Sequence, residues 1–147
     1  MHFSDVKEMF DHYNINRRTN PQYLGSGTYG TVKTVIDRSG RQYAHKVYNR
    51  PFCYDTIREI TTYLYLHKIN KGHLVPKFYG YVFTTAYACI LIEVGQCICD
   101  VPFTYNIVHG LIRTMLEFNS LGLIHRDLKP LNIIITNDNK VVFIDLG

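Results

Sequence analysis

Two neighbouring segments of the chain alternate apolar and polar side chains with a period of two. They cover residues 31–36 and 42–48, and Arg38-Ser39-Gly40 between them has the composition of a tight turn. Alternation of this kind buries one face of a strand, so the pattern predicts an antiparallel pair. Further short strands are expected at residues 23–24, 77–83 and 87–92.

Three other segments repeat apolar side chains at helical spacing. One covers residues 54–68, and the longest covers residues 104–121 and ends at Gly122. A shorter helix is expected over residues 4–13, with Ser4 as its N-terminal cap.

The last part of the chain predicts a β-hairpin. Residues 133–135 and 141–144 are apolar runs that flank a polar turn, and residues 123–124 are expected to form a short strand. Gly95 begins a stretch without a regular pattern. We therefore expect an α+β fold: a five-stranded antiparallel sheet with one helix, then a hinge, a long helix and a hairpin. The expected division is an extension over 1–20, a sheet domain over 21–95 and a second part over 96–147.

The composition is that of a globular protein, with 46% hydrophobic and 19% charged residues. The formal charge of +4 is scattered along the chain, which argues against a nucleic-acid-binding surface. No apolar run approaches the roughly 18 residues of a membrane span, and the first residues lack the pattern of a secretory signal. The four cysteines lack the second spaced pair that a zinc site needs. We therefore expect a soluble intracellular protein of the cytoplasm or nucleus, with reduced thiols.

A glycine-rich turn, Gly25-Ser26-Gly27-Thr28-Tyr29-Gly30, lies between the first two predicted strands. Glycines let a backbone turn sharply and approach a polyphosphate closely. A strand follows these glycines, whereas a dinucleotide-binding fold needs a helix there. Taken alone, the segment is equally compatible with a tight hairpin and with a nucleotide loop.

A lysine and a glutamate follow at positions that suit a phosphate site. Alternation puts Ala44 and Lys46 on one strand face, under the glycine loop if these strands are neighbours. Ala44 leaves room for a flat base, and Lys46 offers a cation to phosphate oxygens. Glu59 lies close to the apolar face of its helix and can pair with Lys46, although an exposed carboxylate is the commoner case.

The most specific signal is His125-Arg126-Asp127-Leu128-Lys129-Pro130-Leu131-Asn132, and Asp145-Leu146-Gly147 begins 13 residues after Asn132. Two carboxylates, an amide and a lysine thus lie on loops that flank the hairpin. Phosphoryl transfer needs this chemistry: oxygen ligands for Mg²⁺, a carboxylate that orients a hydroxyl, and a cation for developing charge.

With these motifs in this order, the sequence from about Tyr23 to Gly147 resembles the eukaryotic protein kinase superfamily. Lys129, two residues after Asp127, is similar to the Ser/Thr kinases more than to tyrosine kinases. The resemblance implies a kinase N-lobe with a partial C-lobe, ATP and Mg²⁺ as cofactors, and protein substrates phosphorylated on Ser or Thr.

The resemblance also implies a role for each matching residue. Asp127 would orient the substrate hydroxyl and accept its proton, Lys129 would contact the transferred phosphate, and Asn132 and Asp145 would bind Mg²⁺. The residues implied in nucleotide binding are Gly25, Ser26, Gly27 and Gly30 over the phosphates, Lys46 with its partner Glu59, Val32, Ala44 and Ile134 around the adenine, Ile92 as the gatekeeper behind it, and Glu93 and Gly95 at the hinge.

Two positions and one spacing depart from the family pattern. His45 replaces an aliphatic residue, and we expect its side chain to point away from the nucleotide. Leu146 replaces the phenylalanine common in the metal-binding loop, and the spacing from Lys46 to Glu59 is short. The short spacing suggests a trimmed connection before the helix.

Two other functions remain open. A half-kinase without catalysis would bind nucleotide, or would displace the matching lobe of a complete kinase and inhibit it. A partner kinase or a separate C-lobe is the partner that this alternative implies. A small-molecule kinase of similar fold is the other alternative, but such enzymes usually lack the full catalytic string at residues 125–132.

The long helix generates a prediction about stability. In the family that the chain resembles, this helix packs on further helices that would follow Gly147. Leaving about five large apolar side chains uncovered forfeits roughly 8–15 kcal/mol of burial. That loss is comparable with the net stability of a domain, roughly 5–15 kcal/mol. We therefore expect the isolated chain to be marginally stable, to aggregate or to need a partner, as thermal unfolding and light scattering would show. A monomer with a sharp and reversible transition would contradict this.

Overall fold

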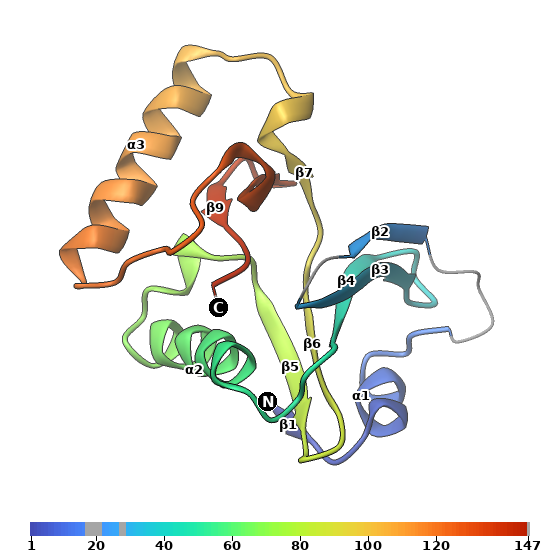
Figure 1. The fold of residues 1–147 in the computed structure, drawn as a ribbon. Coiled ribbons are helices and arrows are strands. Elements are labelled where there is room, and N and C mark those ends of the chain that lie inside the picture. Colours follow the sequence, from blue (N-terminus) through green and yellow to red (C-terminus); the bar gives the residue numbers. More distant parts are fainter. Residues whose placement is uncertain (17–21, 27–28, 147) are drawn as a thin grey trace.

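The fold is described from a computed structural model, for residues 1–16, 22–26 and 29–146. It contains two β-sheets, and the chain passes from the larger to the smaller sheet at Val94 (Figure 1). The larger sheet has the strand order β1-β5-β6-β4-β3-β2. Its strands are β1 (His2–Phe3), β2 (Gln22–Ser26), β3 (Gly30–Ile36), β4 (Gln42–Tyr48), β5 (Phe78–Phe83) and β6 (Ala88–Glu93).

The prediction of five antiparallel strands is wrong in one respect, because β1 adds a sixth strand to the sheet. It pairs in parallel with β5, with His2 opposite Tyr81 and Phe3 opposite Val82. A strand of two residues is too short for alternation to show in the sequence, and its partner is distant along the chain. The other predicted strands of this sheet form within two residues of their expected bounds.

In the described part of the chain, three α-helices accompany the sheets: α1 (Val6–His12), α2 (Tyr54–Lys68) and α3 (Tyr105–Ser120). Short 3-10 turns lie at Gly72–Leu74, Ile98–Asp100 and Pro130–Asn132. The prediction of Ser4 as the cap of the first helix is wrong. The Asp5 carboxylate caps α1 by accepting a hydrogen bond from the Glu8 N–H at 2.8 Å. Ser4 instead donates its N–H to the Glu8 carboxylate at 3.0 Å.

The smaller sheet has the order β7-β8-β9, with β7 (Gly95–Cys97), β8 (Ile133–Thr136) and β9 (Val141–Phe143). The predicted hairpin is present, but the irregular stretch expected from Gly95 is a third strand that pairs with β8. The strand predicted at residues 123–124 does not form, and Ile124 is 73% exposed. Strand formation at both places depends on a partner, which a local sequence pattern cannot reveal.

Alternation along β4 divides the larger sheet between two hydrophobic cores. Ala44 and Tyr48 pack on the face covered by α2, together with Ile60. Tyr43 packs on the opposite face, where Phe10 of α1 lies. Figure 1 shows α1 and α2 on opposite sides of the sheet. The N-terminal residues thus cover the face of the sheet that α2 leaves open.

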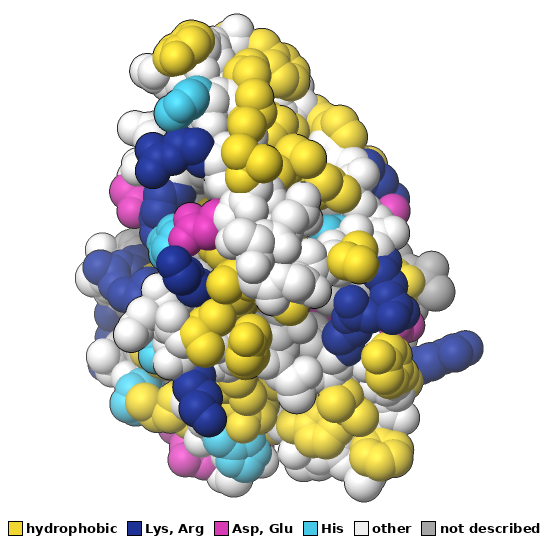
Figure 2. All heavy atoms as spheres, turned by 90° about the vertical axis from the view of Figure 1, so that its left-hand side faces the viewer, with side chains coloured by type: hydrophobic (Ala, Val, Ile, Leu, Met, Phe, Trp, Pro, Cys, Tyr) yellow, Lys and Arg dark blue, Asp and Glu magenta, His cyan; other side chains and the backbone are white. Residues whose placement is uncertain are grey.

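One face of α3 remains largely uncovered. Phe118 is buried and packs edge to face on Phe143 of β9, with ring centroids 5.5 Å apart. Val108, Ile112 and Leu116 are 39%, 49% and 65% exposed. Figure 2 shows hydrophobic side chains gathered on this side of the molecule. An apolar patch on a helix of this length is typical of a surface that another structural element covers.

His45 generates a prediction about pH. Its ring packs edge to face on Phe10 at 5.0 Å, away from Lys46, and its Nε2 atom is buried without a hydrogen-bond partner among the described residues. Burial, with Lys33 nearby, lowers the pKa of His45 from 6.5 to about 4. Between these values the unfolded chain binds a proton that the folded chain excludes. The free energy of unfolding should therefore fall as the pH drops from 6.5, by at most about 1.4 kcal/mol per pH unit.

The measurement is urea denaturation of wild type and His45→Leu at several pH values between 4 and 7. The substitution should flatten the pH dependence in this range, because it removes the titrating group and keeps an apolar side chain against Phe10. Equal slopes for the two proteins would show that His45 does not titrate as described.

Candidate active site

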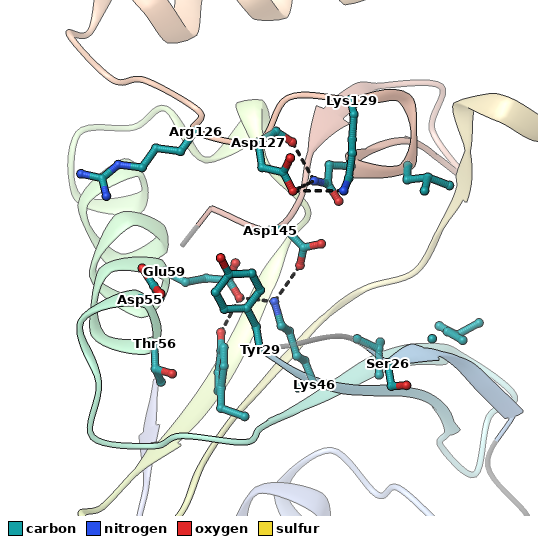
Figure 3. A pocket seen from close by; sticks show the side chains of 17 residues that line it. Ser26, Tyr29, Lys46, Asp55, Thr56, Glu59, Arg126, Asp127, Lys129 and Asp145 are labelled. Atoms are coloured by element: carbon teal, nitrogen blue, oxygen red, sulfur yellow. Dashed lines mark hydrogen bonds and ion pairs between the residues drawn. The ribbon is translucent and has the colours of Figure 1, made fainter.

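A cleft of about 850 Å³ lies between the two sheets and is open to solvent on one side. Figure 3 shows Lys46, Glu59 and Asp145 pointing toward one another on one side of this cleft, with Asp127 and Lys129 on the facing wall. The lining residues come from β2, β3 and the residue before β3, from β4 and α2, and from the segments after α3 and after β9. They are Leu24, Gly25, Ser26, Tyr29, Gly30, Val32, Lys46, Tyr48, Asp55, Thr56, Glu59, Arg126, Asp127, Lys129, Leu131, Asn132 and Asp145.

Lys46 and Glu59 form the ion pair that the sequence suggested, with Nζ 2.7 Å from Oε1. Both residues are buried, at 6% and 2% exposure. Lys46 lies on the inner face of β4 because it alternates with His45, and Glu59 lies on the face of α2 that packs on the sheet. The commoner case of a solvent-exposed carboxylate therefore does not apply here.

The ammonium of Lys46 is shared between two carboxylates, because it also lies 2.7 Å from Oδ1 of Asp145. Burial by itself would lower the pKa of Lys46, but the charges of Glu59 and Asp145 outweigh burial and raise it. Lys46 is therefore a cation that faces the cleft from a largely dry environment. Such a charge interacts more strongly with an anionic ligand than a solvated lysine does.

The loop from His125 to Asn132 is held together by hydrogen bonds between side chains and backbone. His125 Nδ1 accepts from the Asp127 N–H at 3.1 Å, so its Nε2 carries the proton and donates to the Ile144 carbonyl at 2.6 Å. Asn132 Nδ2 donates to the Asp127 carbonyl at 2.7 Å and to the Asp127 carboxylate at 3.3 Å. These bonds connect the loop to the end of β9 and orient the carboxylate of Asp127.

Asn132 and Asp145 present oxygen atoms that suit a divalent cation. The amide nitrogen of Asn132 is engaged with Asp127, which leaves its amide oxygen as an available ligand. Asp145 lies in the left-handed backbone region, at a φ of 56°, and its side chain is 42% exposed to the cleft. A carboxylate and an amide oxygen are ligands that Mg²⁺ accepts in proteins. The chemistry of these two side chains, which line the same cleft, therefore suits a Mg²⁺ ion.

The predicted glycine loop lies over this cleft as far as it is described. Gly25, Ser26 and Gly30 line the cleft, and Gly27 falls outside the described residues. A Cβ atom at Gly30 would clash with the backbone carbonyl of Val47 on the paired strand β4, so only glycine fits. Val32 lines the same wall.

The other predicted nucleotide contacts lie beyond this cleft, close to the link between the sheets. Ala44 pairs with Ile92 across β4 and β6, and both are buried in the core. Ile134 is also buried, at 8% exposure, and its side chain lies against Gly95. Glu93 ends β6 and donates its N–H to the Lys77 carbonyl at 2.9 Å. The structure therefore brings the phosphate end of the predicted site together, while five of the six residues expected around the base, all except Val32, do not line the cleft.

Several lining residues were missed by sequence reasoning. Tyr48 follows Lys46 by two positions, so the alternation of β4 was a signal that could have placed it on the same face. Asp55 and Thr56, in the first turn of α2, carried no comparable signal. Tyr29 was seen only as part of the glycine loop, and Figure 3 shows its ring over the cleft.

The comparisons with known proteins agree with this geometry. Residues 18–147 match the family model described as the protein kinase domain. The chain therefore belongs to the protein kinase family.

Similar curated proteins include three kinases. Mitogen-activated protein kinase 13 of Mus musculus is 29% identical over 143 residues, which cover 86% of this chain and 39% of that protein. The probable dual specificity protein kinase YAK1 homolog of Encephalitozoon cuniculi is 31% identical over 142 residues, or 84% of this chain and 35% of that protein. Serine/threonine-protein kinase PKH3 of Eremothecium gossypii is 28% identical over 142 residues, which cover 84% of this chain and 19% of that protein. The chain thus spans less than two-fifths of the length of these relatives.

No helix in the described part of the chain is long and apolar enough to cross a membrane.

Proposed function

We propose that the cleft binds ATP together with Mg²⁺ and transfers the γ-phosphoryl group to Ser or Thr hydroxyls of protein substrates. The observation that carries this proposal is the convergence of Lys46, Asp127, Asn132 and Asp145 on one cleft from three separate segments of the chain. Family membership supports the class of reaction, and Lys129 two residues after Asp127 favours Ser and Thr over Tyr.

Each of these residues has a proposed task that follows from its surroundings. Lys46 would bind phosphate oxygens, since its ammonium faces the cleft and is held by Glu59. Asn132 and Asp145 would hold Mg²⁺, which when bound neutralises and bridges phosphate oxygens. Asp127 would orient the substrate hydroxyl and accept its proton, because its carboxylate is 58% exposed at the cleft and anchored by Asn132. Lys129, 3.2 Å from Asp127, would contact the transferred phosphate.

The base would then lie toward the link between the sheets. Val32 already lines the cleft, and Ala44, Ile92 and Ile134 offer apolar surface farther in. The backbones of Glu93 and Gly95 would supply the polar contacts to the edge of the adenine. These assignments rest on the family resemblance, and their positions next to the phosphate end are compatible with it.

A second candidate function is a non-catalytic module that binds or inhibits another kinase. The uncovered apolar face of α3, with Leu116 at 65% exposure, favours a partner that covers it. The partner would be a C-lobe of the same type, in a longer chain or in another kinase. Phosphoryl transfer by the purified pair separates the two functions, because an inhibited pair would bind nucleotide without turnover.

Asp145→Ala tests the metal assignment. It should weaken Mg²⁺-dependent nucleotide binding by about tenfold or more, because one of the two proposed oxygen ligands is lost. Isothermal titration with ATP, in the presence and absence of Mg²⁺, measures the effect. The control is Asp138→Ala, which removes a carboxylate on the β8–β9 turn outside the cleft. Equal Mg²⁺ dependence in wild type and Asp145→Ala would refute the assignment.

Asp127→Asn tests the catalytic assignment. It should lower phosphoryl transfer from radiolabelled ATP to a Ser/Thr peptide library by about a hundredfold or more, because the amide cannot accept the hydroxyl proton. Nucleotide affinity should change little. Asp100→Asn, at an exposed aspartate outside the cleft, is the matched control. Undiminished turnover by Asp127→Asn would rule out the proposed role of this carboxylate.

A further inference from the structure

The buried carboxylate of Glu59 accepts hydrogen bonds from two other groups besides the ammonium of Lys46. Its Oε1 atom accepts from Lys46 Nζ at 2.7 Å and from the phenol of Tyr48 at 2.5 Å. Its Oε2 atom accepts from the Leu146 N–H at 2.6 Å. Three donors from two segments, β4 and the residues after β9, thus surround a side chain that is 2% exposed. A carboxylate can be buried at tolerable cost only when it is hydrogen-bonded in this way.

Tyr48 contacts both members of the ion pair. Its hydroxyl donates to Glu59, and its ring centroid lies 5.2 Å from the ammonium of Lys46. The contact arises from the strand itself, because Tyr48 lies two residues beyond Lys46 and projects to the same face of β4. Tyr48 is 5% exposed and is one of the residues that line the cleft.

The hydrogen bond from Tyr48 to Oε1 matters because the ammonium of Lys46 does not interact with Glu59 alone. Its ammonium also bonds to Asp145 at 2.7 Å, and in the proposed reaction it would turn toward phosphate oxygens. Without Tyr48, the donors left to Glu59 among the described residues would be the Leu146 N–H and an ammonium of Lys46 that it shares with other anions. A buried carboxylate with too few donors either draws the lysine back or moves toward solvent. Either response would misplace Lys46 or the helix α2 that carries Glu59.

We propose that Tyr48 is a positioning residue for nucleotide binding at this site: its hydroxyl holds Glu59 while Lys46 engages the phosphates, and its ring supports the ammonium. This inference rests on the proposed function, because it assigns Tyr48 a part in binding ATP with Mg²⁺. Tyr48 acts through Glu59 and Lys46 and has no assigned bond to the reacting atoms.

Tyr48→Phe tests the hydroxyl while keeping the ring and nearly the same volume. Affinity for ATP with Mg²⁺ should fall by about three- to tenfold, the range expected when one hydrogen bond to a charged group is lost and only part of the loss reaches the ligand. In steady-state turnover, KM for ATP should rise by a similar factor while kcat changes less than twofold. Tyr63→Phe is the matched control. Tyr63, on α2, is buried like Tyr48, but its ring stacks on Phe78 and no hydrogen bond joins it to Glu59. The control should change affinity by less than twofold.

A double-mutant cycle with Glu59→Gln asks whether Tyr48 acts through the carboxylate. The effect of Tyr48→Phe on nucleotide affinity should largely disappear when Glu59→Gln is present, because the charged acceptor is already gone. A full effect in both backgrounds would overturn the proposal, as would a loss of thermal stability in Tyr48→Phe with unchanged affinity and KM. The latter outcome would leave Tyr48 a packing residue.

Folding of the variants extends the test. If Tyr48→Phe alone does not fold but the double variant does, an unsatisfied Glu59 is the cause, which supports the proposal. If Glu59→Gln folds and the double variant does not, Tyr48 is needed independently of Glu59 and the proposal fails. A wild-type protein that does not bind ATP with Mg²⁺ would instead refute the proposed function, so the two failures are distinguishable.

Discussion

The buried ion pair between Lys46 and Glu59 is the interaction on which the arrangement of the site depends. Neither charge is tolerable at this depth without its partner, so the pair forces α2 to lie with Glu59 against β4. Glu59 also accepts a hydrogen bond from the Leu146 N–H, so the same requirement fixes the position of the segment that carries Asp145. A helix, a sheet and a loop are thus held in one relative position by the need to satisfy a single carboxylate.

The smaller sheet supplies the other half of the site by a simple geometric rule. In the β8–β9 hairpin Ile133 is paired with Phe143, so the residues just outside this pair lie close together. Asn132 precedes β8 and Asp145 follows β9, which brings an amide and a carboxylate 13 residues apart in sequence to one end of the hairpin. The bonds from His125 to Ile144 and from Asn132 to Asp127 then attach the remaining loop to this end.

Local patterns predicted a large share of both the fold and the site. The bounds of α2 and β4 follow from periodicity, and the lysine, the carboxylates and Asn132 were found because phosphoryl transfer needs these groups. The wrong predictions about strands concern short ones, whose formation depends on a distant pairing strand and not on the local pattern. The strands β1 and β7 are two and three residues long and exist only because a distant strand pairs with them. Residues 123–124 are apolar but have no strand beside them in the described structure, so the local preference had no effect.

The sequence by itself determined which chemical groups are present, the order in which they occur, and which faces of the long elements are apolar, because these properties depend on neighbours along the chain. The tertiary structure alone decided that Glu59 is buried rather than solvated, that Tyr48 and Leu146 share its oxygens, and that Ala44, Ile92 and Ile134 lie away from the cleft. Those outcomes depend on which side chains become buried together when the strands and helices pack. Burial is a property of the packed assembly of strands and helices, and no single segment contains it.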